Sequence, residues 1–338
     1  MAIDATLPPW PDIEGQQEWS GLLVGNGASR AVWDRFDYGS LYSKAMSADV
    51  QHPLNAADQA IFNALGTENF EATMAGLRLS RDVCAALGIP APQINQRYAA
   101  IQTALIEAIH AVHISWGAIP TASLEKIRNA LLPYGYVYST NYDLIVYWAM
   151  MAQPKASGFT DYFWAPDCAF DLANTVKVWP KVTKVLYLHG GIHLYRLSNG
   201  VTVKKIAANT GTLLDTFGQA YMGADVPLFV AEGQADDKQR SIRRSEYLSF
   251  AFSEFTNHQG PLVVFGHALG HPDQHLVNAM SHWSQLTVPQ IAISMRPDTA
   301  VNVVAKKAGF HQALPNMTLL FFDATTHPLG DGGLKVNP

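Results

Sequence analysis

The strongest constraint on the fold of this chain is a repeated pattern, in which a short apolar run ends in glycines or polar side chains. In the first instance, Gly21-Leu-Leu-Val leads into Gly25-Asn-Gly27, and a helical stretch follows at residues 30–35. A strand, a tight glycine turn and a helix form the opening unit of nucleotide-binding α/β folds. Plain turns that bind nothing also contain such glycine pairs, so this loop alone indicates little.

Further strand-like runs follow along the chain, each short and several rich in β-branched or aromatic residues. They are residues 134–138, 185–188, 227–230, 262–265, 291–294 and 319–322. Helical candidates separate some of them, at residues 245–255, 273–285 and 300–308. Buried strands that alternate with helices predict a parallel sheet covered by helices on both faces. The expected fold class is therefore α/β, with a Rossmann-like sheet.

A different pattern occupies residues 55–131. Alanine is abundant there, and apolar residues recur at spacings of three and four, as in Phe70, Met74 and Leu77. This spacing predicts helices. We therefore expect a helical insertion in a single α/β domain, flanked by an N-terminal segment and a C-terminal tail. The boundaries are 1–20 for the segment, 21–54 and 132–325 for the domain, 55–131 for the insertion and 326–338 for the tail.

The composition is that of an ordinary globular protein, with 48% hydrophobic residues, 15% charged residues and a formal net charge of −5. The densest basic stretch, residues 238–244, follows Asp236 and Asp237, and we expect it to be a solvated surface patch. Direct nucleic-acid binding is not indicated. No apolar window of about 18 residues occurs, so no membrane span is expected.

The chain has two cysteines, Cys84 and Cys168, and neither belongs to a C-x-x-C pair. This excludes a structural zinc site built on thiolates. Two free thiols and a polar, proline-rich N-terminal stretch without signal-peptide character fit a reducing compartment. We therefore expect a cytoplasmic protein.

A second predicted strand ends in Thr140, Asn141 and Asp143. Open α/β sheets bind their ligands at this end of their strands. A helix is predicted to begin at Leu144, so Asp143 could instead cap that helix and Asn141 could be a turn residue. Taken singly, the structural role is the simpler explanation for each.

His189 is the first polar residue after the strand predicted at residues 185–188. Gly190 and Gly191 follow it and leave space around its imidazole, which can titrate near neutrality and act as a base. A single histidine at the end of a strand is more often structural. Its position at another strand end is what favours a functional role.

The strand at residues 262–265 runs into Gly266, and a helix opens at Asp273. Three histidines in this region are spaced four residues apart, which suggests metal ligation on one helical face. The intervening Gly270 and Pro272 should break the regular helix that this requires, so we predict no metal here. The histidines are His267, His271 and His275.

In combination and in this order, the motifs resemble the sirtuin-like superfamily, in particular the bacterial sirtuin-like NAD hydrolases of antiphage defence operons. The segments that carry the resemblance span Gly21 to about Ser294. They are Gly25-Asn-Gly-Ala-Ser29, Ser139-Thr-Asn-Tyr-Asp143, Leu188-His189-Gly190 and Phe265-Gly-His-Ala-Leu-Gly270 with Asp273, supported by a helix start at Ser245-Glu-Tyr247.

The resemblance implies that Asn141 and His189 are the catalytic pair. Asn141 would orient the ribose or the attacking water, and His189 would contact the hydroxyls of the nicotinamide ribose and accept a proton. Asp143 would help to recognise the carboxamide, and Phe36 would cover the nicotinamide.

The resemblance also implies a set of NAD-contacting loops. Gly25, Gly27 and Ser29 would contact the pyrophosphate and the adjoining ribose, and Gly266 and Leu269 would line the adenosine side. The same loops contribute Asn26, Thr140 and Asp273 to the predicted NAD-contacting residues.

NAD would then be the substrate. Cleavage of the nicotinamide glycosidic bond passes through an oxocarbenium-like state, and positioning plus an ordered nucleophile should supply most of the rate. Protein-deacylating sirtuins carry a zinc ribbon with two C-x-x-C pairs, which this chain lacks, so no zinc is expected and water is favoured as the acceptor. The expected activity is NAD hydrolysis to nicotinamide and ADP-ribose. The alternatives are ADP-ribosyl transfer or deacylation, and a sensor that binds NAD or ADP-ribose without consuming it.

The resemblance further implies control by assembly in an antiphage system. Related systems pair such subunits with a hexameric ATPase or a nucleotide-processing protein from the same operon, and an oligomer is expected. The helical insertion could supply the contact surface, although core packing is its simpler role.

Overall fold

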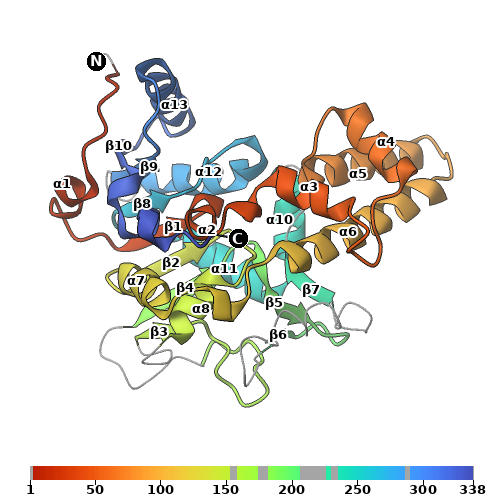
Figure 1. The fold of residues 1–338 in the computed structure, drawn as a ribbon, viewed down its shortest axis with the longest axis horizontal. Helices are drawn as coiled ribbons and strands as arrows, with labels where there is room; N and C mark the ends of the chain where they lie inside the picture. The colour runs from red at the N-terminus through yellow and green to blue at the C-terminus, as the bar shows by residue number, and fades with distance from the viewer. Residues whose placement is uncertain are drawn as a thin grey trace.

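The computed structural model describes residues 3–152, 158–173, 182–205, 226–229, 235–285 and 290–337. At its centre is a seven-stranded sheet in the order β10-β9-β8-β1-β2-β4-β3, in which every pairing is parallel (Figure 1). The strands are β1 Gly21–Val24, β2 Tyr136–Ser139, β3 Phe159–Thr160, β4 Thr183–Tyr187, β8 Leu262–Phe265, β9 Gln290–Met295 and β10 Thr318–Asp323. The predicted α/β, Rossmann-like fold is confirmed.

Helices flank this sheet on both sides, which explains why its central strands are apolar throughout. All four residues of β1 and all four of β8 are buried. One group of helices packs as α7 against α8, and another as α10 with α11 and α12. Their bounds are α7 Thr121–Leu131, α8 Ile145–Met151, α10 Ala235–Arg243, α11 Glu246–Thr256 and α12 Gln274–Ser281.

Strand register places the ends of four strands in one row. Val24 lies opposite Ser139 on one side and opposite Phe265 on the other, and Ser139 lies opposite Tyr187. The loops that carry the sequence motifs therefore leave the same edge of the sheet. The chain passes from β1 toward β2 but from β8 toward β9, in the opposite direction. Ligands of open α/β sheets bind at such a switch point, beyond the carboxyl ends of the strands.

A second sheet, which the sequence analysis did not predict, has three antiparallel strands in the order β6-β5-β7. They are β5 Gly190–Arg196, β6 Thr202–Lys204 and β7 Val226–Phe229. Assigning the run at residues 227–230 to the parallel sheet was therefore wrong, and residue 230 lies outside the described residues. The first six residues of β5 are all buried, so this strand lacks the polar alternation by which an antiparallel strand is recognised.

The range 55–131 is helical, as predicted, and α4, α5 and α6 form a group at one end of the molecule (Figure 1). Local signals define these helices. Asn55 and Asp58 form a capping box, Gly66 ends the first helix in a left-handed conformation, and Asn69 caps the second. Their bounds are α4 Ala56–Leu65, α5 Phe70–Ala86 and α6 Pro92–Val112, and α3 Tyr38–Ala45 packs against α6.

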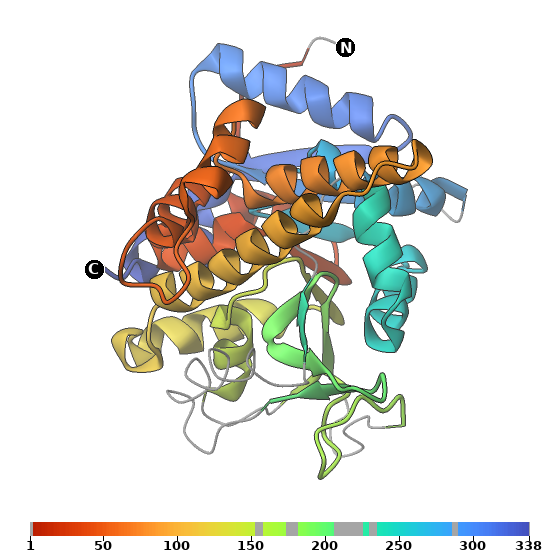
Figure 2. The same cartoon turned by 90° about the vertical axis from the view of Figure 1, so that its right-hand side faces the viewer.

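Three other helices have different bounds from those predicted, and the difference matters most at the first of them. The helix predicted at residues 30–35 is α2 Asn26–Val32, so the glycine loop itself forms the first helical turn. The helix predicted at 273–285 is α12 between two short 3₁₀ turns, and that at 300–308 extends as α13 Ala300–Ala313. Figure 2 shows α13 lying over the β9–β10 edge of the sheet. Near the N-terminus, α1 comprises Trp10–Glu14.

One hydrophobic cluster unites these parts. It includes Leu22 and Val264 of the sheet together with Phe62, Phe70 and Ile101 of the helical insertion. The insertion therefore shares the core of the sheet. Among the described residues, no helix has both the length and the apolar character needed to cross a bilayer. Both cysteines are free thiols.

Candidate functional site

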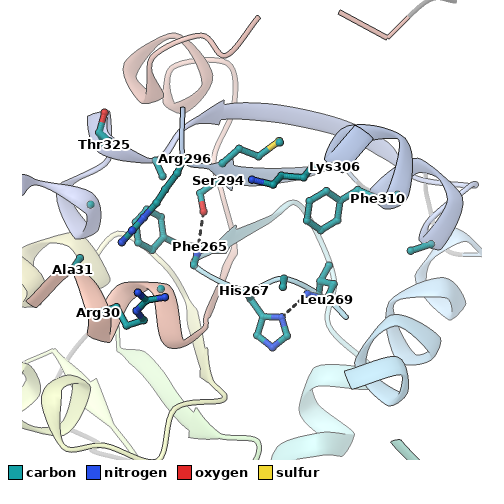
Figure 3. A pocket seen from close by; sticks show the side chains of 18 residues that line it. Arg30, Ala31, Phe265, His267, Leu269, Ser294, Arg296, Lys306, Phe310 and Thr325 are labelled. Atoms are coloured by element: carbon teal, nitrogen blue, oxygen red, sulfur yellow. Dashed lines mark hydrogen bonds between the residues drawn. The ribbon is translucent and has the colours of Figure 1, made fainter. Parts of the chain in front are cut away.

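Two adjoining cavities lie at the carboxyl edge of the sheet. The larger has a volume of about 680 Å³ and lies among the loops that follow β1, β8 and β9 (Figure 3). The smaller has a volume of about 330 Å³ and lies among the loops that follow β1, β2 and β4. Their shared wall consists of Gly27, Arg30, Gly266, His267 and Ala268. An extended ligand can therefore contact both cavities across the switch point of the sheet.

Asn141 and His189, the predicted catalytic pair, line the same smaller cavity. Both are buried, with exposed fractions of 6% and 4%. The strand register explains this meeting, because Asn141 follows β2 and His189 follows β4, which are neighbours in the sheet. Phe36, Thr140 and Asp143 line this cavity too, as does Asn26, whose side chain donates to the carbonyl of Phe36 at 2.9 Å.

The amide of Asn141 is held by two hydrogen bonds. Its Nδ2 donates to the carbonyl oxygen of Gly25 at 3.0 Å and to Ser29 Oγ at 2.8 Å. Both amide protons are thereby used, which fixes the orientation of the side chain. Its Oδ1 forms no hydrogen bond within the described residues and remains available to accept one from a ligand.

Ser29 connects Asn141 to Asp143. Its hydroxyl donates to Asp143 Oδ2 at 2.5 Å, and Asp143 Oδ1 accepts from the backbone N–H of Ile145 at 2.8 Å. Burial raises the pKa of Asp143, and these hydrogen bonds partly offset that effect. Asp143 therefore accepts a hydrogen bond from the first residue of α8, which is close to the helix-capping role considered from the sequence. It also lines the smaller cavity.

Ser29 itself lines neither cavity and is 1% exposed, and Gly25 also lies outside both walls. The predicted contact of these residues with a pyrophosphate is thus not supported. The physical reason is that the hydroxyl of Ser29 points back into the protein, where it holds two buried side chains.

Close packing between two loops explains the glycines. The N–H of Gly27 donates to the carbonyl oxygen of Gly266 at 2.8 Å, and a Cβ on Gly27 would lie 2.6 Å from Gly266 Cα. Gly266 has a φ of 67°, and a Cβ there would lie 2.6 Å from the nitrogen of Ala28. The glycines bring the loops after β1 and β8 into contact. Because the N–H of Gly27 is already paired, it is not free for a phosphate.

His189 lies in a cluster of buried polar side chains. Its Nε2 is 3.0 Å from His275 Nε2 and 3.9 Å from Asp273 Oδ1. Burial, reinforced by the nearby ammonium of Lys238, lowers the pKa of His189 well below its ordinary value. The imidazole is therefore neutral at neutral pH, and the same burial and charge disfavour its protonated form. Either Nε2 atom can be the donor in the histidine pair.

Lys238 was not predicted as a site residue. It is 2% exposed, and its Nζ lies 2.8 Å from Asp273 Oδ1 and 3.2 Å from Glu71 Oε2. This ion pair network joins α10, the loop after β8 and the first turn of α5 in the helical insertion. The prediction of a solvated patch at residues 238–244 is wrong for Lys238. Its two partners are far away in the sequence, so no local pattern marks it.

The pKa values of the two carboxyl groups that pair with Lys238 are shifted in opposite directions. Burial raises the pKa of Glu71, and the lysine only partly offsets this. Burial also tends to raise the pKa of Asp273, but His189, His267 and Lys238 together hold it below its ordinary value. Carboxyl groups whose environments separate their pKa values are a common feature of active sites.

His267, His271 and His275 do not lie on one regular helix, because α12 begins only at Gln274. The chain breaks its helix at residues 271–273 as predicted, and His271 lines neither cavity. Among the described residues, however, His189, Asp273 and His275 offer ligand atoms within 4.8 Å of one another. The ammonium of Lys238 already neutralises Asp273 at this point, and it would repel a metal cation.

The remaining predicted residues divide between the two cavities. Leu269 lines the larger cavity, Gly266 lines both, and Asp273 lines the smaller one. Leu269 adopts a φ of 47°, and its N–H donates to His267 Nδ1 at 2.9 Å. The loop after β8 therefore contributes to both ends of the site.

A family model described as a domain of unknown function, DUF4917, matches residues 22–329. The chain belongs to the DUF4917 family. The DUF4917 domain thus begins in β1 and includes every residue that lines the smaller cavity. A search of curated proteins finds no match to the chain.

Proposed function

We propose that this DUF4917 protein is an NAD hydrolase, which cleaves the bond between nicotinamide and ribose to give nicotinamide and ADP-ribose. The observation that carries the proposal is that Asn141 and His189 line one cavity at the switch point of the sheet. A larger cavity adjoins it, as the two halves of a dinucleotide require. The resemblance of the four strand-end motifs to sirtuin-like NAD hydrolases supports the same activity.

In this proposal the bond from the ribose C1′ to nicotinamide breaks with both electrons going to the ring nitrogen, which removes the positive charge of the ring. Asn141 Oδ1 accepts a hydrogen bond from the attacking water or from a ribose hydroxyl. His189 accepts a proton and passes it on to bulk water, because burial and the Lys238 ammonium disfavour the imidazolium and the carboxylate of Asp273, 3.9 Å away, only partly offsets them. General base catalysis of this kind contributes roughly 10²- to 10⁴-fold.

Water is the favoured acceptor because the smaller cavity has a volume of only about 330 Å³. Leu41, Glu71 and Ile109 line it on the side of α3, α5 and α6. A deacylase must admit an acylated peptide chain to the same ribose, which needs an open groove. Transfer to a macromolecule is therefore the less favoured alternative.

The test is release of nicotinamide from NAD by the purified protein. Asn141→Ala and His189→Ala should each reduce the rate by at least about a hundredfold. The exposed Asn129 and His311 provide matched controls, and Asn129→Ala and His311→Ala should retain the wild-type rate. Undiminished NAD loss in a folded Asn141→Ala protein would refute the assignment. Calorimetric binding of NAD without any nicotinamide release by the wild type would favour the sensor instead.

Control by a partner, in an antiphage system of the cytoplasm, is part of the proposal. Leu79 and Val83 of α5, and Leu87 directly after its last residue, are exposed at a spacing of four residues, with exposed fractions of 67%, 50% and 68%. An exposed apolar stripe of this kind suits a contact in an assembly. Size-exclusion chromatography of the chain alone and with the product of a neighbouring gene tests it. A lone monomer with full activity would contradict control by assembly.

A further inference from the structure

The larger cavity carries positive charge without any acidic side chain in its described walls. Its cationic residues are Arg30 from α2, Arg296 directly after β9 and Lys306 from α13. Phe265, Leu269 and Phe310 supply apolar surface between them. Figure 3 shows Arg30 and Arg296 on one side of the cavity, with Lys306 and Phe310 on the other. The cavity therefore combines aromatic surface with three cationic side chains.

Two of these cations lack a full set of protein partners. Lys306 Nζ pairs with Asp298 Oδ2 at 2.8 Å. Arg296 is exposed and forms no ion pair within the described part of the chain. The Nε of Arg30 is buried and has no hydrogen-bond partner there. A buried donor without a partner is costly, and an anionic ligand would satisfy it.

The position of Arg296 indicates which part of a ligand it would meet. Ser294, two residues earlier, accepts a hydrogen bond from the N–H of Gly266 at 2.9 Å. This bond joins the end of β9 to the loop that follows β8. In dinucleotide-binding α/β folds, an acidic residue near the adenosine ribose binds its 2′-hydroxyl, whereas an arginine there accommodates a 2′-phosphate. In this chain Arg296 directly follows β9 and lines the larger cavity. The acid two residues further on, Asp298, is not among the residues that line this cavity, and it pairs with Lys306.

We propose that the larger cavity binds an adenosine ribose that carries a 2′-phosphate, so that the preferred substrate class is the phosphorylated dinucleotide NADP. Arg296 is the principal phosphate contact, because a planar guanidinium can donate two parallel hydrogen bonds to phosphate oxygens. Arg30 lines both cavities and lies where the two halves of the dinucleotide join. This inference rests on the proposed function, since it takes the larger cavity as the adenosine half of the site.

Calorimetry with ligands that lack nicotinamide tests the phosphate contact without any turnover. The full-length protein should bind adenosine 2′,5′-bisphosphate at least about tenfold more tightly than 5′-AMP, the factor that one charge-assisted hydrogen bond supplies. The preference should decrease as salt is raised, because Arg296 is exposed and its charge is screened. Adenosine 3′,5′-bisphosphate should not share the full preference.

The Arg296→Gln variant should lose the preference while keeping the affinity for 5′-AMP. Arg81→Gln, which removes an exposed arginine from α5, should keep both and serves as the matched control. Equal affinities of the wild type for the two nucleotides, or an unchanged preference in Arg296→Gln, would overturn the inference.

Nicotinamide release from NADP and from NAD separates this inference from the proposed function. A wild-type kcat/KM at least about tenfold higher for NADP, lost in Arg296→Gln, supports both. Equal kcat/KM values for NAD and NADP leave the hydrolase and eliminate the 2′-phosphate site. Tight binding of the bisphosphate without release from either dinucleotide eliminates the hydrolase and keeps the phosphate site.

Discussion

The location of Asn141 at the edge of the sheet could be predicted from the sequence, because a polar residue at the end of a buried strand is a local signal. The location of His189 was predicted in the same way, and both residues line the smaller cavity. The residues that complete their surroundings carry no such signal. Glu71 lies in a helix far earlier in the chain and Lys238 in a charged stretch, and their ion pair depends on the tertiary fold. The sequence therefore indicates where a side chain lies when a local strand-end pattern determines its position, whereas the catalytic roles of Asn141 and His189 stay predictions.

Ser29 illustrates a residue whose role only the structure could assign. Removing its hydroxyl in Ser29→Ala leaves buried groups of both Asn141 and Asp143 without a partner. We expect the free energy of unfolding to fall by about 1–3 kcal/mol, the cost of an unsatisfied buried group. We also expect kcat for nicotinamide release to fall by roughly ten- to a hundredfold, with a smaller change in KM, because the amide of Asn141 is no longer oriented.

Urea unfolding and steady-state kinetics measure these two effects of Ser29→Ala. Ser43→Ala, at an exposed position on α3, is the control and should change neither quantity. Wild-type kcat in Ser29→Ala would show that the orientation of Asn141 does not depend on this hydroxyl.

At the scale of elements, the parallel strands were predictable because each is a short apolar run between turn residues. The antiparallel sheet was not, since β5 is buried on both faces and begins directly after the β4 motif. Gly190, interpreted from the sequence as space around an imidazole, has a φ of 76° and turns the chain from β4 into β5. The same signal can therefore mark a functional loop and a change of sheet.

The contact between α5 and α10 provides a test at this scale. Lys238→Met leaves the partly buried Glu71 and Asp273 without their cation, and breaking a fully buried pair costs about 3–5 kcal/mol, which is the upper bound here. Glu71→Gln removes one of the two carboxylates that Lys238→Met leaves without a partner. The double variant Glu71→Gln/Lys238→Met should therefore be more stable than Lys238→Met alone. Chemical unfolding of the four proteins in a double-mutant cycle measures the coupling.

Arg243→Met, an exposed position on the same helix, is the control for Lys238→Met and should leave stability nearly unchanged. If Lys238→Met unfolds at the same urea concentration as the wild type, the ion pair network does not hold the helical insertion to the site.

At the scale of the whole molecule, the helical insertion and the sheet share one hydrophobic core, and residues of both line the smaller cavity. The sequence indicated the insertion through its helical spacing, but it could not indicate that Glu71 of this insertion would reach the site. That contact depends on how α5 packs against α10 and the loop after β8. The proposed site therefore requires both the sheet and the helical insertion.

The most direct test of the central claim is product analysis after incubation of the purified protein with NAD or NADP in water enriched in ¹⁸O. The account predicts equal amounts of nicotinamide and of ADP-ribose or its 2′-phosphate, with one ¹⁸O atom in the anomeric hydroxyl and no label on protein. Intact dinucleotide after prolonged incubation, or ADP-ribose found attached to protein, would contradict it.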